Sequence, residues 1–348
     1  MKLLIVTQKV DSDDDVLGFF HKWLEVFSIS FENITVICLG KGKVALPENV
    51  NVLSLGKEKK ASRFAYIFNF YTYIWQERKK YDVVLVHMNK EYVLLGSLLW
   101  QLLGKKVFFW YNHTYGTFSA RLAGILADRI FYTSSYSFFS GSRKAIQMPV
   151  GVDMEQFKPE ASLAKENAVL FFSRISPVKN LEVLIEAAEK WDRDSVLIPV
   201  HIYGAALKKD QAYFASLKAR AEPLIKKGKI VFHGSVAYID APEIFRTYTL
   251  FANLTQSGSF DKTIIEAMAS GVLVVASNKS FEDLLPLEYH ASMVFEEKNA
   301  HAFAQKVAAL VRLTPEEKAK IGAELRELVM KKHSLELLSK RIAEESNA

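Results

Sequence analysis

The sequence SGSFDKTIIEAMASGVLVVAS, residues 257–277, contains the local pattern that decides the fold. A polar turn with a glycine leads into a short helix, a second glycine turn follows, and the segment ends in a buried apolar strand. An apolar run at residues 250–254 precedes it, so the unit consists of strand, loop, helix and strand. In a parallel sheet such a loop opens at the carboxyl edge, where ligands bind and a helix N-terminus faces them.

Two charged residues stand at the start of this helix. Lys262 lies near the helix N-terminus, and Glu266 lies one turn further along, on the adjoining face. A cation, a helix dipole and a carboxylate within one turn suit a phosphate and a sugar diol together. An ordinary amphipathic helix with two solvated charges fits this stretch equally well. The segment therefore indicates a ligand site only in combination with other residues.

Length and composition indicate two folded domains. The chain has 348 residues, of which 50% are hydrophobic and 12% aromatic, which suffices for two cores and argues against disorder. The single cysteine, Cys38, lies in an apolar run and excludes an intramolecular disulfide or a cysteine-rich metal site. The longest apolar run, residues 92–103, is shorter than the roughly 20 residues of a membrane helix. The sequence predicts a cytoplasmic protein that touches the inner face of a membrane at most peripherally.

The formal charge of +6 leaves three classes of partner to consider. A basic surplus suits nucleic acid, an anionic membrane or an anionic small substrate. Because zinc-ligand spacing, a helix-turn-helix and an aromatic RNA-recognition signature are all missing, we expect no nucleic-acid partner. Residues 61–76, ASRFAYIFNFYTYIWQ, predict a helix with an aromatic face, and the basic sequence ERKK follows it. Such a helix fits an anionic membrane surface, or else a core-facing or interdomain position.

Strands and helices alternate twice along the chain, with a polar linker at residues 158–167 between the two series. The expected strands are residues 2–8, 33–39, 50–55, 82–87, 106–113, 129–133 and 145–149, followed by 168–173, 196–203, 230–233, 250–254, 272–276 and 292–295. This pattern predicts an α/β protein with two Rossmann-like, doubly wound domains that face a central cleft. Such a cleft is the natural place for a ligand.

Arg174 and Lys179, in the sequence FFSRISPVKN, are the most informative pair of cations. Arg174 follows a predicted strand end and Lys179 precedes a predicted helix, so both converge on the carboxyl edge of the sheet. Arginine binds a diphosphate in a bidentate manner, and lysine acts as a point charge. When a diphosphate leaves during group transfer, fixed cations and helix N-termini stabilise its growing negative charge. This chemistry needs no metal or other cofactor, and no Asp-x-Asp pair lies in a convincing metal-binding context.

Four segments together resemble a retaining glycosyltransferase of family four, with the GT-B fold. They are VLFFSRISPVKNLEVLIEA at residues 169–187, GSFDKTIIEAMASGVLVVAS at 258–277, ADRIFYTSS at 127–135 and MPVGVDMEQFKP at 148–159. The resemblance implies transfer of a sugar from a nucleotide diphosphate sugar to a saccharide or lipid-linked saccharide. It also implies an acceptor-side domain at residues 1–157 and a donor-binding domain at 158–348, whose last helix packs back on the first domain.

The resemblance implies roles for individual residues. Arg174 and Lys179 match the cations that hold the donor diphosphate, and Glu266 matches the second glutamate of the Glu–seven residues–Glu motif, which binds the ribose. His113, in YNHT, resembles the histidine that reaches the donor sugar, and Gly18 matches the loop whose backbone approaches phosphate and sugar. The remaining donor-binding residues implied by the family pattern are Ser259, Phe260, Asp261, Lys262, Thr263 and Val236.

The chain departs from the family pattern at Gly258, where the first glutamate of the motif is expected. The usual Gly-Phe-Gly that follows is replaced by Ser259, Phe260 and Asp261. We interpret this as a variant donor site in which Asp261 binds sugar hydroxyls and Lys262 adds charge at the diphosphate, because the diphosphate and ribose ligands remain together. Two alternatives stay open: a nucleotide-sugar epimerase on the same fold, and a non-catalytic glycosyltransferase-like binding subunit.

Overall fold

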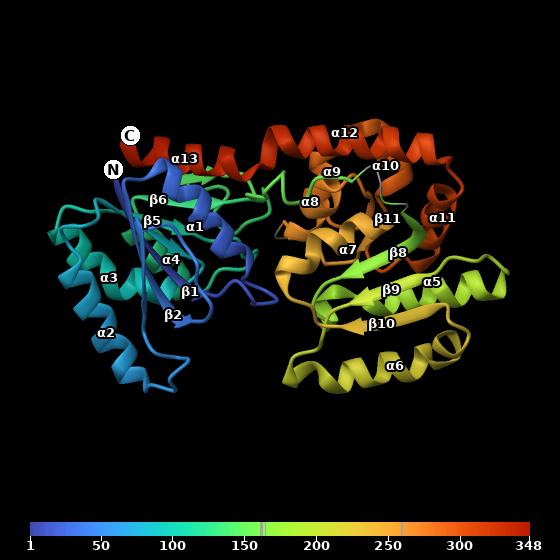
Figure 1. Ribbon diagram of the computed structural model, residues 1–348, viewed down its shortest axis with the longest axis horizontal. Coiled ribbons are helices and arrows are strands. Elements are labelled where there is room, and N and C mark those ends of the chain that lie inside the picture. The colour runs from blue at the N-terminus through green and yellow to red at the C-terminus, as the bar shows by residue number, and fades with distance from the viewer. Residues whose placement is uncertain (161–162, 164, 259) are drawn as a thin grey trace. The chain divides into compact units, whose positions relative to one another are not determined.

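The computed structural model describes residues 1–160, 163, 165–258 and 260–348, and the chain forms two compact units (Figure 1). The first unit contains Met1–Gly151, Ala237–Ile239 and Leu335–Ala348, and the second contains Val152–Val236 and Asp240–Ser334. Within the described ranges, no helix combines the length and the apolar character that crossing a bilayer requires.

The first unit is built on a seven-stranded parallel sheet. In sheet order its strands are β3 (Val50–Ser54), β2 (Asn33–Lys41), β1 (Lys2–Val10), β4 (Val83–His87), β5 (Lys106–Trp110), β6 (Arg129–Tyr132) and β7 (Ala145–Gln147). The central strand β1 pairs with β2 on one side and with β4 on the other. Its apolar residues from Leu3 to Val6 are fully buried, as expected for a strand that helices cover on both faces.

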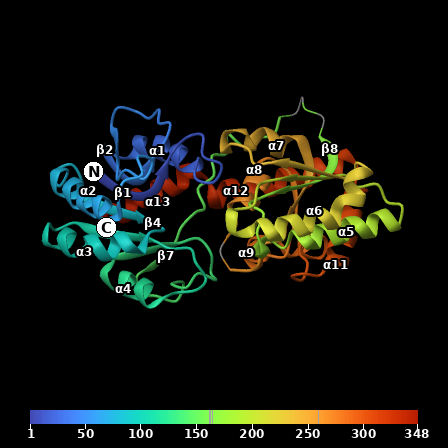
Figure 2. The ribbon, with the colours of Figure 1, turned by 90° about the horizontal axis from the view of Figure 1, so that it is seen from below.

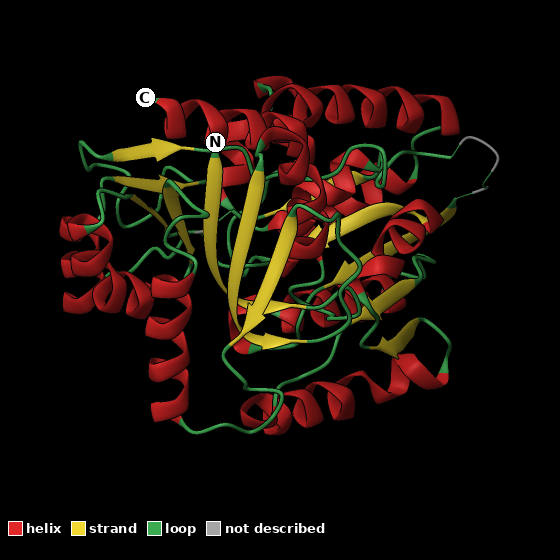
Figure 3. Cartoon of the chain, turned by 60° about the vertical axis from the view of Figure 1, so that its left-hand side comes forward, coloured by secondary structure: helices red, strands yellow, loops and turns green. Residues whose placement is uncertain are grey.

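Helices cover both faces of this sheet (Figure 3). They are α1 (Phe19–Ser30), α2 (Arg63–Gln76), α3 (Lys90–Leu102), α4 (Phe118–Leu126) and α13 (Leu335–Asn347). One core cluster joins Trp23 of α1 to Leu338 and Ile342 of α13. A second cluster joins Phe70 of α2 to Trp100 of α3. The last helix, α13, therefore contributes to the core of the first unit.

The second unit is built on a five-stranded parallel sheet. In sheet order its strands are β10 (Ile230–Gly234), β9 (Val200–Tyr203), β8 (Glu166–Phe172), β11 (Tyr248–Asn253) and β12 (Leu273–Ala276). Its helices include α5 (Leu181–Arg193), α6 (Gln211–Lys226), α7 (Ala241–Thr247), α8 (Lys262–Ala269), α9 (Lys279–Leu284), α10 (Leu287–Met293), α11 (Ala300–Val311) and α12 (Pro315–His333). Short 3-10 turns in this unit are η1 (Pro177–Lys179) and η2 (Lys208–Asp210), and a third turn, η3 (Tyr238–Asp240), spans the point where the chain passes from the first unit to the second. Helices α5 and α6 pack side by side (Figure 2).

These two parallel sheets confirm the α/β class and the Rossmann-like character that the sequence predicts. One predicted strand, at residues 292–295, is wrong. Helix α10 continues to Met293, whose side chain is fully buried, and Val294 forms only an isolated parallel bridge with Ala276. A short apolar run of this kind does not distinguish a buried helix end from a strand.

The first long segment of the first unit ends at Gly151, whereas the sequence places the domain boundary after residue 157. The residues between these two positions are held by contacts within the second unit. Arg326 of α12 donates hydrogen bonds to the carbonyl oxygens of Met154 (2.9 Å) and Phe157 (3.3 Å). The Phe157 ring also packs on Phe245 of α7, with 6.0 Å between centroids. The polar composition of residues 158–167 therefore does not coincide with the change of unit.

Candidate functional site

Arg174 lies directly beyond the carboxyl end of β8. The backbone on either side is fixed to the segment after β9, because Ser173 N donates to Tyr203 O (3.1 Å) and Ile175 N donates to Ala205 O (3.0 Å). The side chain of Arg174 is exposed, and among the described residues it has no ion pair or hydrogen-bond partner. Its guanidinium is therefore free to bind an anion at this edge of the sheet.

Gly204 allows this close approach between two loops. Its φ is +141°, and a Cβ atom at this position would lie 1.9 Å from the carbonyl oxygen of Ser173. Only glycine fits such a contact without displacing the backbone. The path of the chain at Arg174 therefore depends on the absence of a side chain at position 204.

Asn180 fixes the turn η1 to the end of β11. It adopts a left-handed conformation (φ 45°, ψ 41°), which asparagine tolerates better than most residues. Its Nδ2 donates to Leu254 O at 2.8 Å, and the side chain is buried. Although Asn180 occupies the N-cap position of α5, its side chain makes no capping hydrogen bond to that helix. The N-terminus of α5 thus begins without a side-chain cap, next to Lys179.

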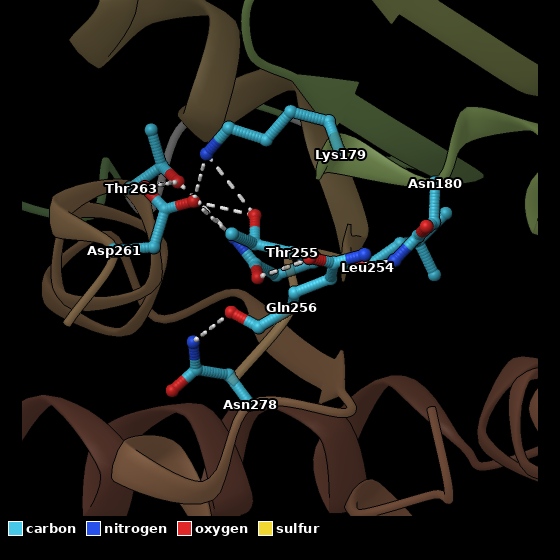
Figure 4. A network of polar contacts seen from close by, with 9 residues as sticks. Lys179, Asn180, Leu254, Thr255, Gln256, Asp261, Thr263 and Asn278 are labelled. Carbon is cyan, nitrogen blue, oxygen red and sulfur yellow. Dashed lines mark hydrogen bonds and ion pairs between the residues drawn. The ribbon is translucent and has the colours of Figure 1, made fainter. Parts of the chain in front are cut away.

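Lys179 and Asp261 form a largely buried ion pair at the same edge (Figure 4). The distance from Lys179 Nζ to Asp261 Oδ2 is 2.5 Å, and only 14% and 12% of the two side chains are exposed. Lys179 Nζ also donates to Thr255 Oγ1 at 3.1 Å. Lys179, which the sequence predicts to hold a diphosphate, therefore has its ammonium group held in place by Asp261 and Thr255.

Both oxygens of Asp261 accept hydrogen bonds from other donors. Asn253 Nδ2 (3.0 Å) and Thr255 Oγ1 (2.8 Å) donate to Oδ2, and Thr263 Oγ1 donates to Oδ1 (3.0 Å). Burial alone would raise the pKa of Asp261, but the charge of Lys179 and these hydrogen bonds outweigh it and hold the pKa well below its usual range. Asp261 is consequently an ionised anchor for Lys179.

Asp261 is also the N-cap residue of α8, yet its side chain does not cap that helix. Because the carboxylate turns toward Lys179, the N-terminus of α8 begins without a side-chain cap, as that of α5 does. Helix N-termini carry partial positive charge and backbone N–H groups that suit phosphate. Lys179 thus lies between the starts of two helices that can each contribute to an anion site.

Glu266 and Lys262 lie one turn apart in α8, with 3.8 Å between Oε1 and Nζ. Glu266 is buried, with 1% of the residue exposed. Burial lowers the pKa of the Lys262 ammonium to about 8, although the carboxylates of Glu266 and Asp153 oppose this shift. Glu266 is therefore a buried carboxylate beside a cation and not a solvated surface charge.

Gly258 has φ +151°, so the residue that replaces the family glutamate is held in a conformation that favours glycine. Its carbonyl oxygen accepts a hydrogen bond from Ser280 Oγ (3.4 Å). The preceding Ser257 N donates to Glu297 Oε1 at 2.5 Å, which brings a second carboxylate to this turn. Ser259, a donor-binding residue implied by the family pattern, lies outside the described residues.

Two further predicted donor-site residues lie in the second unit. Phe260 packs against His333, with 5.4 Å between ring centroids, and burial together with the charge of Lys332 lowers the pKa of His333 to about 4. Val236 lies two residues beyond the carboxyl end of β10 and is partly buried. Phe260 is thus in contact with a neutral histidine.

Gly18 and His113 lie in the first unit, at the carboxyl ends of β1 and β5. A Cβ at Gly18 would lie 2.6 Å from Asp14 O and 2.9 Å from Tyr238 Cβ, so a side chain does not fit there. His113 contacts the ring of Tyr111, and burial with the nearby charge of Lys90 lowers the pKa of His113. A neutral imidazole is therefore favoured at this position.

Three residues of the cluster were not identified from the sequence: Asn180, Asn253 and Thr255. Each stands at the end of a strand or the start of a helix, and this position is the signal that could have identified them. Their hydrogen bonds hold the loop after β11 against η1 and the start of α8. They support Lys179 and Asp261, and they are not themselves predicted to touch a ligand.

The chain resembles known proteins in sequence and in fold. Residues 153–327, which include all the described site residues of the second unit, match the glycosyl transferases group 1 family. A segment of 149 residues is 28% identical to mannosylfructose-phosphate synthase of Agrobacterium fabrum, and it covers 39% of this chain and 33% of that relative. The alignment thus spans about a third of the length of the curated relative that it matches.

The fold is similar to that of solved GT-B glycosyltransferases. HepE of Anabaena, solved in complex with UDP, superposes with a TM-score of 0.79 at 17% identity over 100% of both chains. Sucrose-phosphate synthase of Thermosynechococcus elongatus superposes with a TM-score of 0.75 at 13% identity over 100% of this chain and 98% of that one. Because the family match covers half of the sequence and includes the carboxyl-edge cluster, this chain belongs to the glycosyl transferases group 1 family.

Proposed function

We propose that the protein is a retaining glycosyltransferase of family four, which moves a sugar from a nucleotide diphosphate sugar to an acceptor hydroxyl without a metal ion. The observation that carries this proposal is the placement of Lys179 between the N-termini of α5 and α8, neither of which has a side-chain cap. The Lys179 ammonium and the partial positive charges of the two helix N-termini are then available to the same anion. This arrangement supports binding of a diphosphate group and stabilisation of its charge as it leaves.

Arg174 and Lys179 have complementary parts in this proposal. Arg174 has no polar partner among the described residues, so its guanidinium is available for a bidentate bond to phosphate. Lys179 is held by Asp261 and Thr255, so binding the donor costs little loss of side-chain freedom there. Lys262 adds a third cation when it is protonated. Together these groups perform the role that a divalent cation would otherwise have.

Glu266 is proposed to bind the ribose hydroxyls. Its carboxylate is buried and stays close to Lys262, so it is placed to accept hydrogen bonds from a diol. His113 is proposed to contact the donor sugar, and its lowered pKa favours a neutral ring that can donate or accept a hydrogen bond. The backbone at Gly18 and Val236 and the side chain of Phe260 are proposed to complete the donor contacts.

Asp261 is better suited to positioning Lys179 than to binding sugar hydroxyls directly. Four donors already bond to its two oxygens: Lys179, Asn253, Thr255 and Thr263. A sugar hydroxyl would have to displace one of them. We therefore propose that Asp261 acts through Lys179 in the variant motif.

The proposal also names a class of donor and a class of acceptor. The solved HepE structures contain UDP, glucose or UDP-glucose, so a uridine diphosphate sugar is the first donor to test. A saccharide or lipid-linked saccharide is proposed as the acceptor, in glycan or glycolipid biosynthesis. A cytoplasmic location with peripheral contact to an anionic membrane belongs to the same proposal.

A transfer assay tests the function. The protein is incubated with UDP-glucose and a panel of saccharide and lipid-linked acceptors, and the released UDP and the anomeric configuration of the product are measured. We expect UDP release that depends on the acceptor, with retained configuration and an unchanged rate in the presence of a chelator. Release that a chelator abolishes would contradict metal independence, and an inverted product would contradict retention.

Gly258 favours one alternative, a non-catalytic subunit that binds a nucleotide sugar. The family motif lacks its first carboxylate here, and Ser257 and Gly258 are engaged by Glu297 and Ser280. Thermal shift with UDP, GDP and ADP sugars separates the two functions, because a ligand that binds the folded state raises its melting temperature. Donor binding without transfer to any acceptor would favour the subunit, and no shift with any donor would contradict both.

A further inference from the structure

One face of α2 (Arg63–Gln76) consists of large apolar side chains that are exposed to solvent. They recur every three or four residues, so they lie along one side of the helix. The exposed fractions are 85% for Phe64, 42% for Ile67, 73% for Phe68, 38% for Tyr71 and 51% for Trp75. A contiguous exposed apolar surface marks a site of interaction with another molecule.

The opposite face of α2 is firmly packed, so the exposure does not reflect a loosely held helix. Phe70 and Ile74 are fully buried in the core between α2 and the sheet. Ser62 caps the helix by accepting a hydrogen bond from Ala65 N at 3.2 Å. Because this packing fixes its rotation, α2 presents the aromatic stripe outward.

Helix α3, which contacts α2, also carries exposed apolar residues. Tyr71 Oη donates to the carbonyl oxygen of Leu95 at 2.9 Å, which joins α2 to α3. The two helices are neighbours in the first unit (Figures 1 and 2). Three and seven residues after Leu95, Leu98 and Leu102 are 66% and 85% exposed. We call the exposed apolar side chains of α2 the docking face, and Leu98 and Leu102 are further exposed apolar residues on the neighbouring helix.

Both ends of α2 are strongly basic. The basic residues are Lys57, Lys59, Lys60 and Arg63 at its start, and Arg78, Lys79 and Lys80 after its end. Two acidic residues lie among these cations, and both already have polar partners. Glu58 accepts a hydrogen bond from Ser54 Oγ at 2.8 Å, and Glu77 forms an ion pair with Lys80 at 3.0 Å. The charge around the docking face is therefore positive at both ends of the helix.

We propose that this docking face binds the surface of an anionic lipid bilayer. Its rings and aliphatic side chains would enter the headgroup region, and the flanking cations would meet lipid phosphates. Arg78 already lies over the Trp75 ring, 4.3 Å from its centroid, which combines an aromatic and a cationic group at one end of the face. The proposal extends the peripheral membrane contact suggested above and does not depend on sugar transfer.

A second copy of the chain fits this face less well than a bilayer. A symmetric contact would place α2 of one copy against α2 of the other, either parallel or antiparallel. Since both ends of the helix are basic, each arrangement would bring cations against cations. An anionic surface attracts both ends at once.

Trp75 provides a direct readout of docking. Of the five tryptophans, all of which lie in the described part of the chain, Trp23, Trp100, Trp110 and Trp191 are buried and Trp75 is exposed. Adding vesicles of phosphatidylcholine and phosphatidylglycerol to the full chain should blue-shift its tryptophan emission. Vesicles of phosphatidylcholine alone should give a much smaller shift, and Trp75→Phe should abolish the response.

Sedimentation with the same vesicles separates the apolar and electrostatic contributions. Phe64→Ser with Phe68→Ser should lower the partition coefficient at least about tenfold, because two rings no longer enter the bilayer. Charge reversal at Lys59 and Lys60 should lower it by roughly fivefold or more per residue. The matched controls are Leu197→Ser with Leu287→Ser, and Lys226→Glu with Lys320→Glu, which change exposed residues of the second unit.

The outcomes are distinct. Equal binding to anionic and neutral vesicles, or wild-type binding by the Phe64/Phe68 variant, would overturn the proposal. A dimer in sedimentation velocity that the same variant dissociates would assign the face to a second copy and also overturn it. Because no donor or acceptor is present, failure here leaves the proposed sugar transfer untouched, and failure of the transfer assay leaves this test valid.

Discussion

The side chains of Lys179 and Asp261, 82 residues apart in the sequence, meet with 2.5 Å between Nζ and Oδ2. This ion pair joins η1, at the start of α5, to the residue that begins α8. It therefore sets the distance between two helix N-termini that lack side-chain caps. Any anion that binds both helices depends on this pair for the geometry of its site.

Replacing Asp261 with Asn tests the pair through stability. Because the pKa of Asp261 is depressed in the folded state, its contribution is present above the ordinary carboxyl pKa, about 3.9, and is lost as the pH falls further. We expect Asp261→Asn to lower the free energy of unfolding by about 3 kcal/mol near pH 7, because it leaves the Lys179 ammonium buried without its counter-charge. This gap should shrink below about pH 4 in urea unfolding measured over a pH series.

The matched control is Asp194→Asn, which removes the carboxylate of an exposed pair with Lys190. That variant should change the free energy of unfolding by less than about 1 kcal/mol. The difference in the free energy of unfolding between wild type and Asp261→Asn could instead stay constant from pH 7 to low pH. That result would refute the role assigned to the ionised Asp261.

Removing either predicted diphosphate ligand should slow transfer strongly. Arg174→Ala and Lys179→Ala should each lower kcat/KM by roughly 10²-fold, because each removes a positive charge that the proposed function places beside the leaving diphosphate. Arg174→Lys should fall between wild type and Arg174→Ala, since lysine keeps the charge and loses the bidentate geometry. Initial rates with a fixed acceptor measure this, and Arg312→Ala on an exposed helix end is the control. Wild-type rates in both alanine variants would remove these residues from the site.

Lys262 predicts a pH dependence of donor binding. Its pKa is about 8 in the folded protein, so the ammonium is charged below that pH and neutral above it. We expect the Kd for the nucleotide diphosphate to rise as the pH increases through about 8, because the site loses a cation. Calorimetric titration over this range measures the effect. The Lys262→Met variant should bind the nucleotide diphosphate more weakly at neutral pH, and its Kd should not change as the pH passes through about 8. The same rise of the Kd near pH 8 in the Lys262→Met variant would show that another group causes it.

Gly258 predicts that restoring the family glutamate destabilises the fold. At φ +151° a side chain is strained, so Gly258→Glu and Gly258→Ala should each lower the free energy of unfolding by about 1–3 kcal/mol. Comparing the two variants separates the strain, which both share, from any effect of the new carboxylate. Thermal unfolding measures both. Unchanged Tm values would show that this turn accommodates side chains.

The fold was largely predictable because its signals are local. Buried parallel strands read as continuous apolar runs, and twelve of the thirteen predicted strands correspond to the strands β1–β12. Residues 292–295 were misassigned because a short apolar run does not reveal whether it ends a helix or forms a strand. The change from the first unit to the second after Gly151 was misplaced because the residues that follow it are held by contacts from α12 that no local pattern contains.

The site was predictable only in part. Arg174 and Lys179 follow from their positions at a strand end and a helix start, and these positions are visible in the sequence. The partner of Lys179 is not, because pairing with Asp261 depends on how two separate loops meet. Neither Asn180 nor Asp261 caps the helix that it precedes, because both side chains make longer-range bonds instead. Such choices arise from tertiary packing.

Helix α13 has a consequence for how the protein is made. Its residues Leu335, Leu338 and Ile342 complete a core that otherwise consists of β1, α1 and their neighbours near the start of the chain. During synthesis, that core therefore cannot close until the ribosome has added the residues up to Ile342, more than 300 positions after β1 and α1. The second unit has all its strands and helices available earlier, so it can reach its native packing while the first unit still lacks a helix.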